Sequence, residues 1–523
     1  MTLSAGGFRR LISGLLIAVL LGCGDTGRAA TEAMELSIAA PADAYGTTSD
    51  ADFGIYPVNA NIYEPLVRLT PDYQIEPWLA TGWEFRPPNS WRFHLRRDVR
   101  MHDGSTFTAE AVRWTMSRVA AMGGGTLGMG DSSVHVIDDY TVEITPTRPN
   151  LRLLQQLAHP NWSILAPGTE PAERAVGTGP FRLAEYAKGD HLTVERFPDY
   201  WSEEARLERL TFRFLPDPNT RVLALRSGQA DVAYDLPREA AQSVSGFPGV
   251  RVARSGVGGY SAIYMNLHGE PPHDLGRDPA IRRALVHAID RREIVENVWL
   301  GNAEPTLTIV PASILGESAG RVRGFAYDPP LARRILEDAG WRLGADGIRV
   351  RNGRRLSLVM IVGFPNPDIH RPMPEVVQAQ LRAVGIEMKI VQTTDNAAYQ
   401  ARVRSGEGDL WAEAGGQNDG NPCFLLDLLF YSAGPTGSVS RYARLFGPGP
   451  RFDRFIDACR AAVDPAEVQR SAAEAMRVLV DEERVVIPLA GTYRLWGLSE
   501  RVQGFEPHPS SLSQRWEGVW LSR

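Results

Sequence analysis

Residues 91–119 read WRFHLRRDVRMHDGSTFTAEAVRWTMSRV, and this stretch contains the pattern of a strand, a turn and a helix. Apolar and polar residues alternate over 91–95, which is the period of a half-buried strand. Asp103 followed by Gly104 indicates a turn. A helix is predicted over 108–119, because a threonine can cap its start and the apolar residues behind it recur on one face. This order favours an α/β class.

The same alternation of strands and helices continues outward from this stretch. Three Asp-Pro pairs each predict a helix start, since aspartate is a good N-cap and proline suits the first helical position: Asp278-Pro279, Asp328-Pro329 and Asp464-Pro465. A further helix is predicted over 375–384, and strands over 34–39, 210–214 and 386–390. We therefore expect an α/β protein with mixed sheets.

Composition limits the classes of protein that fit. The chain has 523 residues, 43 % apolar and 23 % charged, which is globular composition and large enough for about three to five domains. A net charge of −6 without a basic run argues against a nucleic-acid partner. The three cysteines are too few for a disulfide framework and lack zinc-site spacing, although a Cys423–Cys459 bridge stays open.

The N-terminus has the pattern of an export signal. Arg9 and Arg10 precede an apolar run over 11–21, which is too short to span a bilayer but suits a secretory signal. The run ends in LLGC, and this resembles a bacterial lipobox in which Cys23 carries the lipid. We expect a lipoprotein signal peptide over 1–22 and a tether over 23–33; the alternative is ordinary cleavage near residue 30. No later stretch is apolar enough to span a bilayer.

Motifs of covalent catalysis and metal binding are missing from the sequence. GxSxG, HExxH, the Walker loop and the EF-hand loop do not occur. The glycine run over 123–130 lacks a lysine and follows a predicted helix, so we interpret it as a surface loop. His94 and His102 lack a third ligand at suitable spacing. We expect no enzyme and no cofactor.

Eight blocks of sequence, in order, resemble one known family, the extracellular solute-binding proteins of the peptide and nickel class (family 5) that serve ABC importers. The blocks are IYEPLVRL (62–69), PWLATGW (77–83), the stretch over 91–112, GTGPFRL (177–183), PDYW (198–201), LRSGQADV (225–232), IRRALVHAIDR (281–291) and QLRAVGI (380–386). Together they extend over nearly the whole exported chain, so the resemblance rests on an ordered set and not on one motif.

The resemblance implies a two-lobed periplasmic binding protein that closes like a hinged trap. We expect lobe I over 34–62, 180–264 and 488–523, an inserted subdomain over 63–179, and lobe II over 265–487. Such a protein captures a solute in the cleft and delivers it to ABC permease subunits with cytoplasmic ATPases, without covalent chemistry. We expect a monomer in the periplasm or at the outer face of the cytoplasmic membrane, attached to the membrane by its lipid anchor alone.

The resemblance also places the ligand-determining stretch at residues 399–425. Peptide-binding members carry an aspartate there that pairs with the peptide's α-amino group, and Asp419 falls at that position, so a peptide or peptide-like solute is expected. The alternative is that Asp419-Gly420 is a polar turn. Gly415 and Gly416 would let the backbone approach the ligand. The other candidate contacts are Tyr45, Tyr260, Asn266, Tyr399, Trp411 and Glu413.

A nickel chelate, an opine or another small solute is the alternative ligand, and a sensing lipoprotein the alternative role. The nickel branch carries Arg-Pro where this chain has His159-Pro160, and a tyrosine ahead of an Asp-Pro where this chain has Asn421-Pro422. Both differences argue against a metal–chelate pocket of that type. His159 stays a weak metal candidate, because a single histidine is more often a structural hydrogen-bonding residue; no metal site is predicted.

Overall fold

The computed structural model describes residues 35–40, 56–121, 133–146, 152–169, 174–363, 372–417, 420–432 and 442–522. The expected signal peptide, the tether and the glycine run over 123–130 lie outside these ranges. So do three residues assigned a role from the sequence, Cys23, Tyr45 and Asp419. Within the described ranges, no helix is both long and apolar enough to cross a bilayer.

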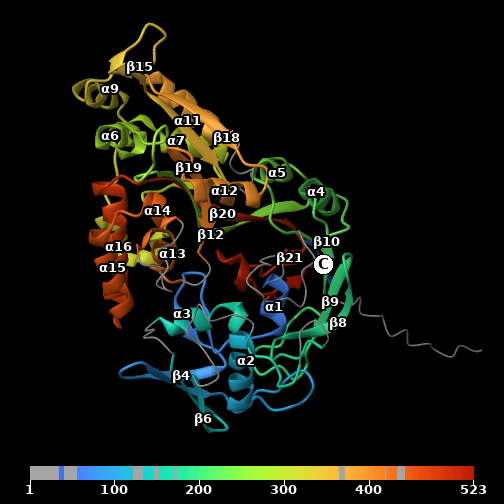
Figure 1. Cartoon of the computed structure of the whole chain (residues 1–523). Helices are drawn as coiled ribbons and strands as arrows, with labels where there is room; N and C mark the ends of the chain where they lie inside the picture. Colours follow the sequence, from blue (N-terminus) through green and yellow to red (C-terminus); the bar gives the residue numbers. More distant parts are fainter. Residues whose placement is uncertain are drawn as a thin grey trace, which may run out of the picture. The chain divides into compact units, whose positions relative to one another are not determined.

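A large mixed sheet runs through the described chain (Figure 1). One end of it, β18-β17-β19, is parallel, and a second parallel group, β11-β1-β10, lies within it; the other neighbouring strands, including those at the β8 end, are antiparallel. The strands in spatial order are β18 (Glu387–Gln392), β17 (Ser357–Val362), β19 (Leu410–Gly416), β12 (Val250–Met265), β20 (Val486–Ser499), β11 (Val232–Ala233), β1 (Glu35–Ala40), β10 (Arg209–Phe214), β9 (His191–Arg196) and β8 (Phe181–Ala187), with β13 (Ala303–Pro305) on β20. The predicted mixed α/β class is confirmed.

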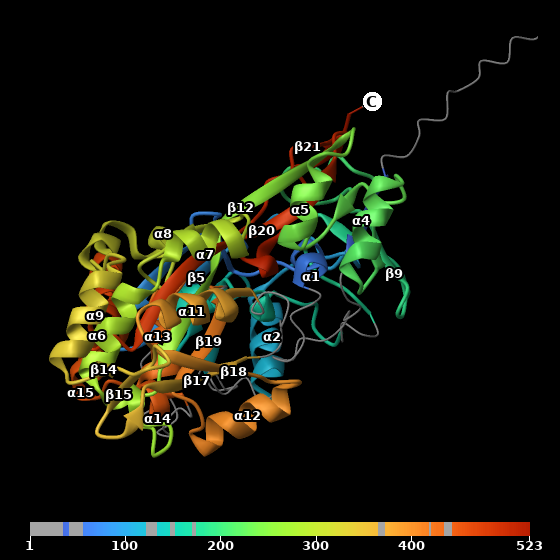
Figure 2. The ribbon, with the colours of Figure 1, turned by 90° about the horizontal axis from the view of Figure 1, so that it is seen from above.

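Two long strands, β12 and β20, lie side by side at the centre of this sheet (Figures 1 and 2). The first part of β12, over 250–254, pairs with β20 alone, and the second part, over 259–265, pairs with β19 as well. The register between β12 and β20 shifts twice between residues 254 and 259. The pairing therefore changes along β12 where three glycines, at 256, 258 and 259, interrupt the strand.

Three buried clusters form the main cores. One covers a face of β17–β19 with α6 (Pro279–Ala288), α7 (Arg291–Val298), α9 (Pro329–Asp338) and α11 (Pro372–Ala383). A second joins β1, β8–β10 and α1 (Tyr56–Ile62) to the C-terminal segment around Trp516. The third contains α2 (Ala109–Ala121), α3 (Leu153–Leu157) and the sheet of β4 (Ala80–Arg86), β5 (Ser90–Leu95), β7 (Thr141–Ile144) and β6 (Val134–Asp138). It also contains the four helices between residues 424 and 477.

The predicted helix starts are confirmed by their caps. The carboxylates of Asp278, Asp328 and Asp464 each accept a hydrogen bond from a backbone N–H in the first turn of α6, α9 and α16 (Pro465–Arg477), with proline at the start of each helix. Gly340 and Gly385, which follow α9 and α11, have φ of +84° and +88°. Because L side chains rarely adopt such angles, glycine is the residue that lets the chain turn away there.

Four of the family-like sequence blocks meet at one buried carboxylate, that of Glu64. It is 0 % exposed and accepts hydrogen bonds from five side chains. The donors are Trp78 Nε1 (2.8 Å), Thr178 Oγ1 (2.9 Å), Tyr200 OH (2.7 Å), Trp201 Nε1 (2.8 Å) and Arg515 Nη2 (3.2 Å). A buried carboxylate is stable only with such compensation, so these four blocks form one structural junction.

One disulfide and the remaining helices and strands complete the fold. A disulfide joins Cys423 to Cys459 across 36 residues, linking α13 (Phe424–Phe430) to α15 (Pro450–Ala461). The other elements are β2 (Val67–Leu69), β3 (Ile75–Pro77), α4 (Pro218–Arg226), α5 (Arg238–Val244), α8 (Ala312–Leu315), β14 (Arg342–Leu343), β15 (Arg349–Arg351), β16 (Arg354–Arg355), α12 (Asn396–Ser405), α14 (Ala443–Phe446), β21 (Val502–Gln503), β22 (Trp520–Leu521) and a π-helical turn (Val478–Glu482) after α16.

Candidate functional site

The parallel strands β17, β18 and β19 end at one edge of the sheet. The residues just beyond their carboxyl ends are Gly363, Thr393 and Gln417. In open α/β sheets, ligands bind outside the carboxyl ends of such strands. The stretch expected to determine the ligand, residues 399–425, begins in α12 and runs through β19 to this edge. We therefore take this edge of the sheet as the candidate site.

One face of β19 carries three of the residues singled out from the sequence, Trp411, Glu413 and Gly415, because alternate residues of a strand share a face. Tyr260 of β12 lies directly opposite Gly415 in the register. A Cβ atom at Gly415 would come within 2.8 Å of the Tyr260 ring. Glycine at 415 thus leaves room for the ring, so Tyr260 lies on the same face of the sheet as Trp411 and Glu413. We call this group of residues the wall of the site.

The Glu413 carboxylate accepts a short hydrogen bond from the Tyr399 hydroxyl of α12. The Tyr442 hydroxyl donates to the Tyr399 oxygen at 3.4 Å. Glu413 is half-buried, although Tyr399 and Trp411 beside it are buried. Removal from water raises the pKa of the Glu413 carboxyl to about 8. Three predicted residues, Tyr399, Trp411 and Glu413, are therefore brought together around one acid.

Gln417, which was not predicted from the sequence, marks the end of this wall. Its side chain is buried, with 1 % of the residue exposed, and neither Oε1 nor Nε2 has a hydrogen-bond partner among the residues that the structure describes. The backbone N–H donates to Gly258 O at 2.8 Å, and the Tyr73 hydroxyl donates to Gln417 O at 3.0 Å. Buried amide atoms without a partner are costly, which sets Gln417 apart from the other side chains at this end of β19.

A third segment reaches the same place from the C-terminus. A Cβ atom at Gly258 would lie 2.1 Å from Pro509 O, and the Tyr73 and His508 rings meet edge to face at 6.3 Å. His508 is buried, and this burial lowers its pKa. Tyr73 has φ +61°, a strained conformation for a bulky residue of the kind that gathers at functional sites. Tyr73 and His508 gave no signal in sequence periodicity, because only long-range packing brings them to Gln417.

Two other predicted residues are engaged by the protein itself. The Asn266 amide donates to Gly406 O and Gly408 O, and its oxygen accepts from the His268 N–H, so its polar atoms support the turn after α12. The His159 Nδ1 accepts from the Asn161 N–H, and burial lowers the His159 pKa to about 4. Gly416 follows Gly415 on the other face of β19 and is exposed.

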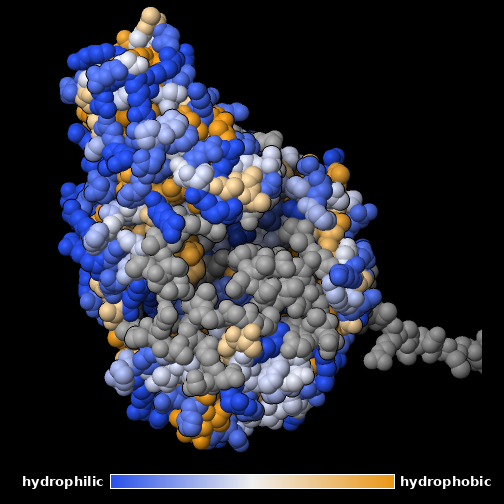
Figure 3. Space-filling model, viewed as in Figure 1, coloured by the Kyte–Doolittle hydropathy of each residue, from blue (hydrophilic) through white to orange (hydrophobic). Residues whose placement is uncertain are grey.

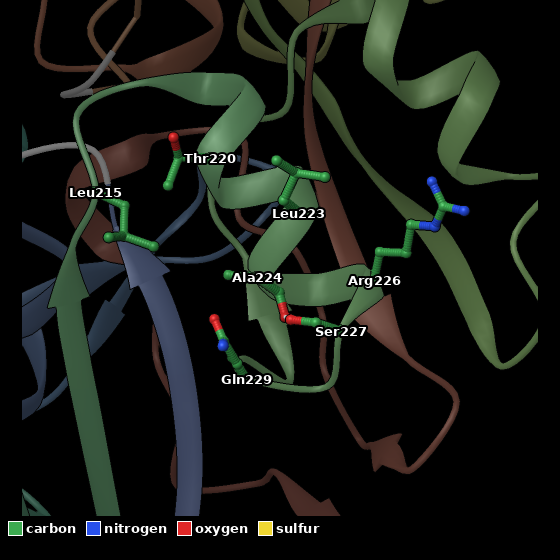
Figure 4. A pocket seen from close by; sticks show the side chains of 7 residues that line it. All are labelled: Leu215, Thr220, Leu223, Ala224, Arg226, Ser227 and Gln229. Carbon is green, nitrogen blue, oxygen red and sulfur yellow. The ribbon is translucent and has the colours of Figure 1, made fainter.

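Hollows elsewhere on the surface share no residue with this wall. A hollow of about 540 Å³ is lined by Leu215, Thr220, Leu223, Ala224, Arg226, Ser227 and Gln229, from α4 and its flanks (Figure 4). The face shown in Figure 3 is largely hydrophilic where the chain is described, and it is hollowed near its centre. Within the described ranges, no three His, Cys, Asp or Glu side chains gather as a metal site.

Comparison with known proteins places the chain in a family. The model of the bacterial extracellular solute-binding proteins, family 5 (middle) matches residues 74–437. The nickel-binding periplasmic protein of Escherichia coli (strain K12) is 28 % identical over 364 residues, 66 % of this chain and 68 % of that protein. The glutathione-binding protein GsiB of Salmonella choleraesuis (strain SC-B67) is 27 % identical over 487 residues, 89 % of either chain.

A solved structure agrees with the sequence matches. NikA from Brucella suis, in complex with Fe(III)-EDTA, superposes with a TM-score of 0.79 at 25 % identity and covers 93 % of this chain and 100 % of its own. The two-lobed periplasmic-binding-protein fold expected from the eight blocks is thereby confirmed. The chain belongs to the bacterial extracellular solute-binding proteins of family 5, the substrate-binding components of ABC importers.

Proposed function

We propose that the solute of this binding protein is a peptide or a peptide-like molecule. The observation that carries the proposal is the buried Gln417 side chain, whose N–H donors and carbonyl acceptor both lack partners within the described part of the chain. A primary amide that donates and accepts side by side is complementary to a peptide group, which does the same. The glutathione-binding relative, similar over 89 % of both chains, supports the same solute class. Asp419 would pair with the peptide's α-amino group, as expected from the sequence.

Calorimetry with a library of di- and oligopeptides tests this proposal. Gln417→Leu keeps the size of the side chain but removes its hydrogen bonds, so we expect it to lower peptide affinity about 5- to 30-fold. The same variant should melt no lower than the wild type without ligand, because it removes unsatisfied buried polar atoms. Asp419→Ala should lower affinity about 10-fold or more. Failure of the whole library to bind would refute the proposal.

A metal chelate is the second candidate, favoured by the similarity to the nickel-binding relative. The described residues hold no cluster of three metal-ligating side chains, so a metal here would have to arrive with its own ligands. Native mass spectrometry of the protein purified from its own host would distinguish the two solute classes by the mass of what co-purifies. A chelate mass in place of a peptide mass would favour this second candidate.

We also propose that Cys23 carries a lipid that holds the exported chain, as a monomer, at the membrane surface. The LLGC sequence over 20–23 supports this attachment. The lobe boundaries expected from the sequence are a separate proposal of ours. Mass spectrometry of the mature N-terminus tests the lipid attachment: a diacylated Cys23 is expected, and an unmodified N-terminus near residue 30 would contradict it.

A further inference from the structure

Glu413 differs from the other acidic side chains that the fold encloses. Three buried carboxylates elsewhere in the described chain are compensated by N–H donors. Glu64 faces Arg515, Asp409 accepts from the Leu275 and Val359 backbones at 3.1 and 2.9 Å, and Asp427 accepts two bonds from Arg460, at 2.6 and 3.0 Å. Glu413 has the Tyr399 hydroxyl as its partner, and none of the ion pairs among the described residues includes it.

The surroundings of Glu413 are aromatic. The Tyr399 and Trp411 rings meet edge to face at 5.4 Å, and the Tyr260 and Tyr264 hydroxyls lie 2.8 Å apart on the neighbouring strand. A half-buried carboxylate among aromatic rings, with no cation paired to it in the described part of the chain, is an expensive arrangement for an empty protein. The same arrangement suits a cation from outside, since the carboxylate attracts its charge and the ring faces attract it further.

Glu413 also lies on the ligand side of the sheet. It shares its strand face with Gly415, and beyond that position lies the unpartnered Gln417 amide at the carboxyl end of β19. Two residues of a strand span about 6.5 Å, so the acid and the amide are about 13 Å apart along the backbone. One solute of peptide size can reach both groups.

We propose that Glu413, positioned by the Tyr399 and Tyr442 hydroxyls and flanked by Trp411, is a subsite for a positively charged nitrogen group of the bound solute. The solute class is thereby narrowed to peptides or peptide-like molecules that carry an ammonium or guanidinium group. The restriction of the solute to such peptides rests on the proposed function. The binding of a cation at Glu413 does not depend on what the rest of the solute is.

Three matched peptides test the subsite by calorimetry: Ala-Arg-Ala, its isosteric neutral counterpart Ala-citrulline-Ala, and N-acetyl-Ala-Arg-Ala. We expect the wild type to prefer arginine over citrulline by about 10-fold or more, and Glu413→Gln to bring this ratio close to one. Glu110→Gln, an exposed acid on α2, is the control that should keep the wild-type ratio. A second outcome is that acetylation of the peptide weakens binding to the wild type but not to Glu413→Gln. That result would assign the α-ammonium group, in place of the guanidinium group, to the same subsite.

The outcomes separate the subsite from the proposed function. If the peptides bind but Glu413→Gln changes neither the arginine preference nor the effect of acetylation, the subsite is refuted and the peptide function stands. If none of the peptides binds the wild type, the peptide function fails. The subsite is then decided by agmatine, a small guanidinium compound, in thermal-shift assays. Stabilisation of the wild type and of Glu110→Gln but not of Glu413→Gln supports the subsite, and no stabilisation of the wild type overturns it.

Discussion

At the scale of single residues, Glu413 makes the fold less stable as pH rises, which is the opposite of what most carboxyl groups do. Its pKa is raised from 4.5 to about 8, so between these values the folded protein holds a proton that the unfolded chain has lost. Stability therefore falls as pH rises through this window. Among the described residues, the groups that face Glu413 are the tyrosines at 260, 264, 399 and 442. Burial raises the pKa of Tyr260 and of Tyr264, so these two hydroxyls do not titrate in this window.

Glu413→Gln, which does not titrate, should show the effect directly in the protein without ligand. We expect it to melt about 1–3 °C above the wild type at pH 8 and to differ little from it at pH 4.5. Thermal unfolding followed by circular dichroism across this range measures the difference. Parallel curves for the two proteins at all pH values would contradict the raised pKa.

Glu64 is the opposite case of a buried acid, because its charge is fully compensated inside the protein. Glu64→Gln would weaken its contacts with five donors and deprive the buried Arg515 of one of its two carboxylate partners. We expect a loss of about 2–4 kcal/mol in the free energy of unfolding, measured by denaturant titration. Glu110→Gln, in an exposed pair with Arg113, should change it by less than about 0.5 kcal/mol.

At the scale of elements, sequence reasoning succeeded where the determining contacts are local. The Asp-Pro pairs that begin α6, α9 and α16, and the glycines that follow α9 and α11, act within a few residues of the chain. Gln417 and Glu64 escaped prediction in their present roles because their partners are distant. Tyr73 lies 344 positions from Gln417, and Arg515 lies 451 from Glu64. No periodicity encodes such pairs.

The glycines of the block over 177–183 show why an element can depend on the absence of a side chain. A Cβ atom at Gly177 would lie 2.1 Å from the Ile62 carbonyl oxygen, at the end of α1. Gly177→Ala should therefore force the two segments apart and cost about 2–3 kcal/mol of stability in denaturant titration. Gly82→Ala, in β4, is the matched control, since no atom lies within 4 Å of its added Cβ. Equal effects of the two variants would argue against this close approach.

The disulfide between α13 and α15 fixes the helix that begins at the end of the ligand stretch. Cross-linking residues 36 positions apart restricts the unfolded chain, so replacing both cysteines by alanine should cost about 4 kcal/mol in the loop-entropy treatment. Both residues are fully buried, which adds a packing loss to the entropic one. Thermal unfolding of the double variant measures the change. A melting temperature equal to that of the wild type would show that the bridge contributes nothing.

At the scale of the whole molecule, three distant parts of the chain converge at Gln417. They are the turn carrying Tyr73, the end of β19 with the middle of β12 beside it, and the C-terminal segment at His508 and Pro509. The first belongs to the expected inserted subdomain, the second to the centre of the sheet and the third to expected lobe I. In a hinged trap, contacts of this kind form on closure, and a solute that binds the closed form stabilises them.

Tyr73→Phe removes one such contact, the hydrogen bond from the Tyr73 hydroxyl to Gln417 O. If this bond belongs to the closed form, its loss lowers the population of that form and weakens every solute by the same factor, which we expect to be about 3- to 10-fold. Calorimetry with two chemically different bound peptides measures it, because a direct ligand contact would affect them unequally. Tyr431→Phe loses a bond of 2.7 Å to Asp457 within expected lobe II and should leave both affinities unchanged. Unchanged affinity in Tyr73→Phe would exclude this bond from the closing motion.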